Sequence, residues 1–247
     1  MVSEAHKFQR GIWVTLLFTF LLWMIKAIEI AFEIDFTEFG ILPRHLYGMF
    51  GIITGPLVHG DIFHLISNTF PLIILGVGLF YFYDRIAFEV ILIIYLMTGF
   101  WVWLAAREAY HIGISGIIYG LLSFLLFSGF IRKDSKSLSV SFIVLFIYGG
   151  NMIYGVFPYN TGVSWESHLL GAISGLFCAI FFRNVAINYK IEPKEELIVV
   201  NRPMIEASVK SKVVYSVKSK TNQLISDNKA EKKPSNYSYK VDEEDLF

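Results

Sequence analysis

Residues 113–131, GISGIIYGLLSFLLFSGFI, are almost entirely apolar, and this run decides the fold. A bilayer core about 30 Å thick is crossed by roughly 20 helical residues, because backbone polar groups must be satisfied within the segment. Ser115 is the third residue of the run. Polar groups at membrane depth persist mainly where they face a partner or a water-filled cavity. The run therefore predicts a membrane-spanning helix that begins with a candidate functional serine.

The whole chain has the composition of a membrane protein. Of its 247 residues, 55% are hydrophobic and 17% are charged, and the mean hydropathy is +0.55. This is more apolar than an ordinary globular domain. The formal net charge is zero, which gives no basis for nucleic-acid binding or for an acidic substrate. The single Cys178 cannot form an intramolecular disulfide and indicates no cysteine metal site.

Five further runs are also long and apolar, so we predict six spans. They run approximately from Ile12 to Phe32, Ile62 to Tyr83, Ile86 to Ala105, Ile114 to Ile131, Leu138 to Phe157 and Trp165 to Phe182. We interpret the first as a retained helix, because its apolar stretch exceeds the roughly 7–15 residues usual in a signal peptide. Near its end, Lys26 and Glu29 are three residues apart, and we interpret them as an ordinary ion pair near the membrane surface.

Basic residues between the spans predict the orientation, because cytoplasmic loops carry an excess of lysine and arginine. One side holds Lys7, Arg10, Arg85, Arg132, Lys133, Lys136, Arg183 and Lys190. The connections on the opposite side hold only Arg44 and Arg107. We expect an integral, multi-pass protein in the cytoplasmic membrane of a prokaryote, with both termini in the cytoplasm.

The composition changes after the sixth span. Residues 184–247 are rich in Lys, Glu, Ser and Asn and have too few apolar side chains to form a core. We therefore predict a six-helix membrane core, residues 1–183, followed by a mostly disordered cytoplasmic tail, residues 184–247. The predicted fold class is all-α, a polytopic bundle of six transmembrane helices.

Four polar residues are expected at a similar depth near the outer face. Ser115 opens one helix, His168 is about one turn into another, and His64 and Asn68 occupy the first two turns of a third. Serine becomes a nucleophile when a base takes its proton, and the resulting oxyanion needs hydrogen-bond donors. Ser115 and His168 can supply the nucleophile and the base. His64 and Asn68 can form an oxyanion site with backbone N–H groups at a helix N-terminus.

Two glycine pairs predict how the serine and histidine helices meet. Gly116 and Gly120 follow the serine, and Gly171 and Gly175 follow the histidine. Small residues four apart let helix backbones approach closely, so we expect one tight helix pair. Gly129 lies near the opposite end of its span, and we expect a leucine there to impair activity far less than a leucine at Gly116 or Gly171.

Three segments resemble the signature motifs of rhomboid intramembrane serine proteases. They are His59–Asn68 (HGDIFHLISN), Gly113–Tyr119 (GISGIIY) and Ser167–Gly175 (SHLLGAISG). The resemblance extends from about Gly40 to Phe182. The chain departs from it at Phe50-Gly51, where many members carry a Trp-Arg pair, so the resemblance does not say how this external loop is anchored.

The resemblance implies a serine endopeptidase that lies in the lipid bilayer and cleaves transmembrane segments of other proteins, without cofactor or metal. It implies Ser115 as nucleophile, His168 as general base, and His64 with Asn68 as the oxyanion site. The supporting residues that it implies are His59, Tyr119, Gly113, Gly116 and Gly171.

Other functions and readings stay open. One is a non-catalytic rhomboid-like protein that binds membrane clients, although such a protein is expected to have lost the serine or the histidine. Another is a small transporter or channel, against which the absence of an inverted repeat argues. A metal site of three histidines lacks a His-Glu-x-x-His string. We interpret His111 as a surface or interfacial residue and Glu166 as a first-turn acid favoured by the helix dipole.

Overall fold

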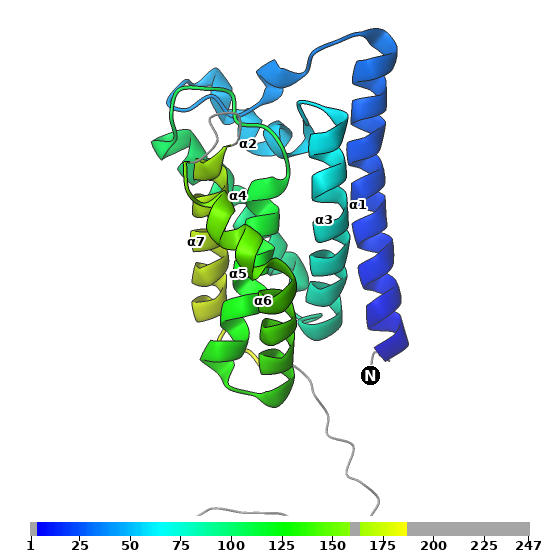
Figure 1. The fold of residues 1–247 in the computed structure, drawn as a ribbon, viewed down its shortest axis with the longest axis vertical. Coiled ribbons are helices and arrows are strands. Elements are labelled where there is room, and N and C mark those ends of the chain that lie inside the picture. Colours follow the sequence, from blue (N-terminus) through cyan, green and yellow to red (C-terminus); the bar gives the residue numbers. More distant parts are fainter. Residues whose placement is uncertain (1–3, 159–163, 187–247) are drawn as a thin grey trace, which may run out of the picture. The chain divides into compact units, whose positions relative to one another are not determined.

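The computed structural model describes residues 4–158 and 164–186, and these form a helical bundle (Figure 1). Its long helices are α1 (Glu4–Phe32), α3 (Ile62–Phe82), α4 (Ala87–Ala105), α5 (Ser115–Arg132), α6 (Ser135–Gly155) and α7 (Trp165–Phe181). They coincide with the six predicted spans to within a few residues, except that α1 begins at Glu4 instead of Ile12. The prediction of an all-helical fold is confirmed.

The helices have the dimensions and surface of a membrane protein. By length and hydropathy, α1, α3, α4 and α5 are able to cross a membrane, whereas α7 and the stretch Ser135–Gly150 of α6 are shorter apolar helices. Many large apolar side chains face outward from the bundle, among them Trp13, Phe20 and Phe146. Exposed apolar side chains of this size are unfavourable in water and suited to lipid hydrocarbon.

Helix α5 occupies the centre of the bundle. It packs against α3, α4, α6 and α7, while α1 and α3 lie side by side (Figure 1). In its most apolar stretch 67% of the residues are buried, compared with 28% in α1. Ser115, the first residue of α5, is therefore carried by the element that the other helices surround.

Helices α5 and α7 touch backbone to backbone. A Cβ atom placed on Gly171 would overlap the carbonyl oxygen of Gly116, and one placed on Gly175 would overlap that of Gly120. The structure thus brings the two glycine pairs against one another, as their spacing predicted. Only glycine at these positions permits the observed separation of the two helices.

Helix α6 packs closely against the C-terminal half of α5. The Ser141 hydroxyl donates to the carbonyl oxygen of Leu126 at 2.6 Å. A Cβ atom on Gly129 would overlap Ser141 Oγ. Gly129 is therefore also a close-contact position, because a second helix occupies the space beside it.

Arginines gather at the end of the bundle remote from Ser115, which we call the arginine end. Arg132 donates to the carbonyl oxygens of Phe182 and Val185 at 2.5 and 2.9 Å, and Arg85 donates to that of Ala186 at 3.1 Å. These contacts hold the chain just beyond α7. The predicted tail from residue 187 onward lies outside the described residues.

The loop between α1 and α3, residues 33–61, is built largely from short helical turns. These are η1 (Thr37–Phe39), η2 (Tyr47–Met49), α2 (Gly51–Thr54) and η3 (Gly55–Leu57). The Arg44 guanidinium donates to the carbonyl oxygen of Ala106 at 2.7 Å, and the Trp103 indole donates to that of His45 at 2.9 Å. Arg44 of the loop and Trp103 of α4 thus anchor the loop against the end of α4. The resemblance to known motifs did not predict these two contacts.

We expect Gly175→Ala to lower the thermal unfolding temperature in detergent by several degrees, because the added methyl group would overlap the backbone of α5. Overpacking of this kind costs about 1–3 kcal/mol. Gly150→Ala is the matched control, since a Cβ atom there has no heavy atom within 4 Å among the described residues. Equal unfolding temperatures for the two variants would contradict the close contact between α5 and α7.

Candidate active site

Ser115 and His168 face one another where α5 and α7 begin. The distance between Ser115 Oγ and His168 Nε2 is 2.8 Å. Both residues are buried, with exposed fractions of 9% and 7%. The two side chains selected from the sequence are therefore in hydrogen-bond contact in a site largely shielded from solvent.

A backbone carbonyl fixes the tautomer of His168. Its Nδ1 lies 2.9 Å from the carbonyl oxygen of Gly155, the last residue of α6. Because a carbonyl oxygen only accepts, Nδ1 carries the proton in this contact, and the neutral ring leaves Nε2 free to accept from the Ser115 hydroxyl. Gly155 was missed in the sequence, because a main-chain carbonyl carries no residue-type signal.

The ring of Tyr119 lies flat against the ring of His168. Their centroids are 4.1 Å apart and their planes differ by 5°. A Cβ atom placed on Gly155 would overlap Tyr119 Oη and lie 3.1 Å from His168 Nδ1. The histidine ring is thus fixed in its plane by Tyr119 and at its edge by the end of α6.

His64 and Asn68 lie one turn apart near the start of α3. The Asp61 carboxylate caps this helix by accepting from the His64 N–H at 2.8 Å. The amide nitrogen of Asn68 is buried and has no hydrogen-bond partner among the described residues. An unused buried donor is costly to a fold, so this amide is suited to a group that is not part of the chain.

His59 and Gly113 connect the start of α3 to the start of α5. The Ile114 N–H points at His59 Nε2 from 3.4 Å, and the rings of His59 and His64 meet at an angle of 63° with centroids 5.1 Å apart. Gly113 has φ +98°, and a Cβ atom there would lie 2.7 Å from Cε1 of His64. Glycine is required here both by the left-handed backbone and by the histidine ring.

Burial lowers the pKa of His59 to about 4, and the neighbouring His64 adds to the effect. His59 is therefore neutral near pH 7, and its Nε2 keeps the lone pair that faces the Ile114 N–H. Among the described residues, no group of three or more His, Cys, Asp or Glu side chains is arranged to hold a metal ion.

The start of α7 is held by a second polar cluster. His111 is buried, its Nδ1 lies 2.5 Å from Ser164 Oγ, and its Nε2 lies 3.0 Å from the carbonyl oxygen of Arg107. Of the two predicted alternatives for His111, surface or interfacial, the first is therefore wrong, because the side chain is buried. Glu166 stands in the first turn of α7, as predicted, and its carboxylate lies 3.6 Å from Arg107 Nε.

Comparison with known proteins decides the family. Residues 46–185 match the Rhomboid domain. The chain belongs to the rhomboid family. The matched region of this rhomboid contains both members of the Ser115–His168 pair, His64 and Asn68, whereas α1 precedes it.

Relatives of this rhomboid occur in bacteria and plants. An uncharacterized protein of Mycobacterium tuberculosis is 34% identical over 178 residues, which cover 66% of this chain and 72% of that protein. An uncharacterized protein of Mycobacterium leprae is 35% identical, covering 66% and 68%. The mitochondrial RHOMBOID-like protein 6 of Arabidopsis thaliana is 33% identical, covering 53% and 42%.

We expect Gly155→Ala to slow the reaction of Ser115 with a fluorophosphonate probe by at least about tenfold, since a misplacement of 1 Å can cost about 100-fold. The added methyl group would displace Tyr119 or the end of α6, and with it the carbonyl that holds His168. Gly150→Ala, in open space on the same helix, serves as the control. Similar labelling rates for both variants would show that the end of α6 does not hold the histidine.

Proposed function

We propose that this rhomboid is an intramembrane serine endopeptidase, with Ser115 as nucleophile and His168 as general base. The observation that carries the proposal is the 2.8 Å contact between Ser115 Oγ and His168 Nε2, with the opposite ring nitrogen held by Gly155. Membership of the rhomboid family and the multi-pass helical fold support a substrate that is itself a membrane-spanning protein.

In the first half of the reaction, His168 Nε2 takes the hydroxyl proton as Ser115 Oγ attacks the carbonyl carbon of the scissile peptide. The new C–O bond converts the carbonyl oxygen into an oxyanion. Collapse of this intermediate breaks the C–N bond, and the proton on Nε2 passes to the leaving amine. The product is an acyl-enzyme ester on Ser115.

In the second half, His168 removes a proton from a water molecule that attacks the ester carbonyl. The C–O bond to Ser115 then breaks, and the serine regains its proton from Nε2. A fixed imidazole suits both halves, because one nitrogen serves as base and then as acid while Nδ1 stays bonded to the Gly155 carbonyl.

The oxyanion is stabilised by donors that the folded chain leaves available. The Asn68 amide has no partner among the described residues, and His64 lies one turn away on the same helix. The first backbone N–H groups of α5 have no acceptor within the helix and add the positive end of its dipole. Donors fixed before the reaction stabilise developing charge more effectively than mobile water does.

We further propose that residues 1–183 form the peptidase and that residues 184–247 are an accessory cytoplasmic tail. The arginine end faces the cytoplasm and the Ser115–His168 pair opens toward the outer face. The cluster of Arg85 and Arg132 at one end supports this orientation through the excess of basic residues on cytoplasmic loops. The mycobacterial relatives support a bacterial membrane as the location.

Ser115→Ala and His168→Ala should each abolish cleavage of a single-span model substrate in proteoliposomes without preventing insertion. Loss of a catalytic nucleophile or its base typically costs about 10⁶-fold. Asn68→Ala should be milder, with a loss of about 100-fold, because it removes one donor among several. Undiminished cleavage by Ser115→Ala would reject the assignment, and an inert wild type would favour a non-catalytic protein that binds membrane clients.

The orientation predicts which loops an impermeant thiol reagent reaches in intact cells. In a Cys178→Ala background, Glu108→Cys should be labelled from outside, because residue 108 is exposed on the α4–α5 loop. Ser135→Cys, exposed at the arginine end, should be labelled only after the cells are permeabilised. The reverse pattern would place the Ser115–His168 pair on the cytoplasmic side.

A further inference from the structure

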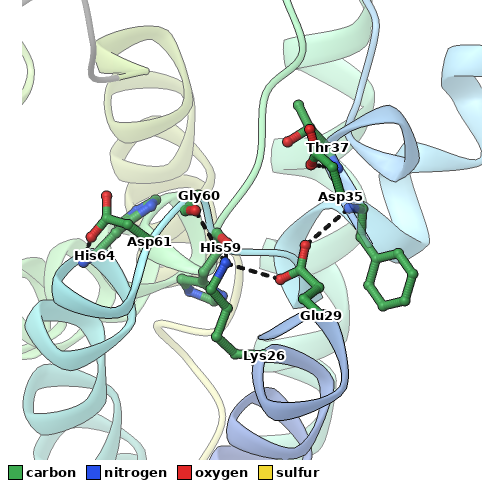
Figure 2. Close-up of polar contacts among 9 residues, drawn as sticks. Lys26, Glu29, Asp35, Thr37, His59, Gly60, Asp61 and His64 are labelled. Carbon is green, nitrogen blue, oxygen red and sulfur yellow. Dashed lines mark hydrogen bonds and ion pairs between the residues drawn. The ribbon is translucent and has the colours of Figure 1, made fainter. Parts of the chain in front are cut away.

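The ion pair between Lys26 and Glu29 is more than the ordinary surface pair that its spacing predicted. Its side chains are only 12% and 5% exposed, and Lys26 Nζ lies 3.1 Å from Glu29 Oε2. Lys26 Nζ also donates to the carbonyl oxygens of His59 and Gly60 at 2.8 and 3.1 Å (Figure 2). One ammonium group thus joins the end of α1 to two successive backbone carbonyls in front of α3.

Glu29 completes this arrangement on the other side. Its Oε1 accepts from the Phe36 N–H at 2.9 Å. Its Oε2 accepts from Lys26 (Figure 2). A buried carboxylate is stable only when its charge and lone pairs are satisfied, and here both oxygens have partners. Glu29 therefore fixes the position of the ammonium group and ties it to the first turn of the α1–α3 loop.

The two carbonyls that Lys26 holds lie directly beside the candidate active site. His59 presents its ring to the Ile114 N–H and to the ring of His64. The residue after Gly60 is Asp61, whose carboxylate caps α3 at the His64 N–H. The position of the His59–Asp61 backbone therefore determines where the His64 side of the site lies relative to the start of α5.

Attachment of α1 to α3 does not depend on this pair. The Trp23 indole donates to Thr69 Oγ1 at 3.1 Å, about one helical turn before Lys26. A Cβ atom on Gly76 would lie 2.9 Å from Thr15, so the two helices are also in close contact nearer the arginine end. These contacts attach α1 to α3 without Lys26. The hydrogen bonds from Lys26 to the His59 and Gly60 carbonyls instead fix the loop in front of α3.

We propose that Lys26, held in place by Glu29, is a positioning residue that fixes the His59–Gly60 backbone and thereby the oxyanion side of the active site. The proposal rests on the proposed peptidase function for its catalytic consequence. It assigns a role to α1, which lies outside the residues that match the Rhomboid domain.

The test compares Lys26→Met with Lys26→Arg and with the double variant Lys26→Met/Glu29→Met. The double variant avoids leaving a buried carboxylate unpaired, which by itself can unfold a protein. The control is Lys7→Met, which removes a matched i,i+3 partner of Glu4 at the other end of the same helix. Each purified protein is measured for kcat and KM on a single-span substrate and for amide hydrogen exchange.

We expect Lys26→Met and the double variant to lower kcat by about 10- to 100-fold with KM nearly unchanged, because the oxyanion donors shift while the substrate-binding surface does not. Amide exchange should rise in peptides covering residues 58–66 and 112–118 and stay unchanged along α1. Lys26→Arg should retain most of the wild-type kcat, and Lys7→Met should match the wild type in both measurements.

Unchanged exchange at residues 58–66 in Lys26→Met and in the double variant would overturn the proposal, as would an equal effect from Lys7→Met. A rise in exchange with wild-type kcat would also overturn it. A wild-type protein that exchanges normally but cleaves nothing would reject the peptidase function instead. In that case, the difference in amide hydrogen exchange at residues 58–66 between Lys26→Met and Lys7→Met would by itself show whether Lys26 positions the loop.

Discussion

The site depends on the contact between the backbones of α5 and α7. In lipid there is no hydrophobic force that drives two apolar helices together, so close packing and hydrogen bonds must hold them. Glycines supply that packing within one turn of Ser115 and His168. The 2.8 Å distance between the two side chains is therefore a consequence of helix separation, and a small change of helix packing is transmitted directly to the reacting atoms.

Around this helix pair, polar contacts at the helix ends set angles that apolar packing leaves free. Apolar contacts are not directional, whereas a carboxylate or hydroxyl that caps a helix fixes where the first turn begins. Asp61 does this for α3 and Ser164 for α7, and Ser164 is itself in contact with the buried His111. The starts of α3 and α7 are thus fixed by side-chain caps, whereas α5 begins after Ile114 without one.

Much of this architecture was predictable, and the failures have a common cause. Apolar runs of about 20 residues are distinctive, so the spans were predicted to within a few residues, except for the start of α1. Helix ends and glycine spacing were also sufficient to place Ser115 opposite His168. The contacts of His168 with Gly155, of His111 with Ser164 and of Lys26 with His59 and Gly60 were not predicted, because each depends on a carbonyl or hydroxyl from a distant segment. Such partners carry no periodicity and become visible only when the chain is folded.

A catalytic site differs from a structural polar cluster in the hydrogen-bond capacity that it leaves unused. The Lys26 ammonium and both Glu29 carboxylate oxygens are occupied by contacts within the described part of the chain, as expected of a structural pair. The Asn68 amide is a buried donor without a partner among the described residues. Thr98 Oγ1 shares that property, so an unused donor alone does not define a site. Asn68 differs because it lies one turn beyond His64, whose ring lies beside Gly113, two residues before Ser115. In the proposed reaction, the oxyanion would form beside that serine.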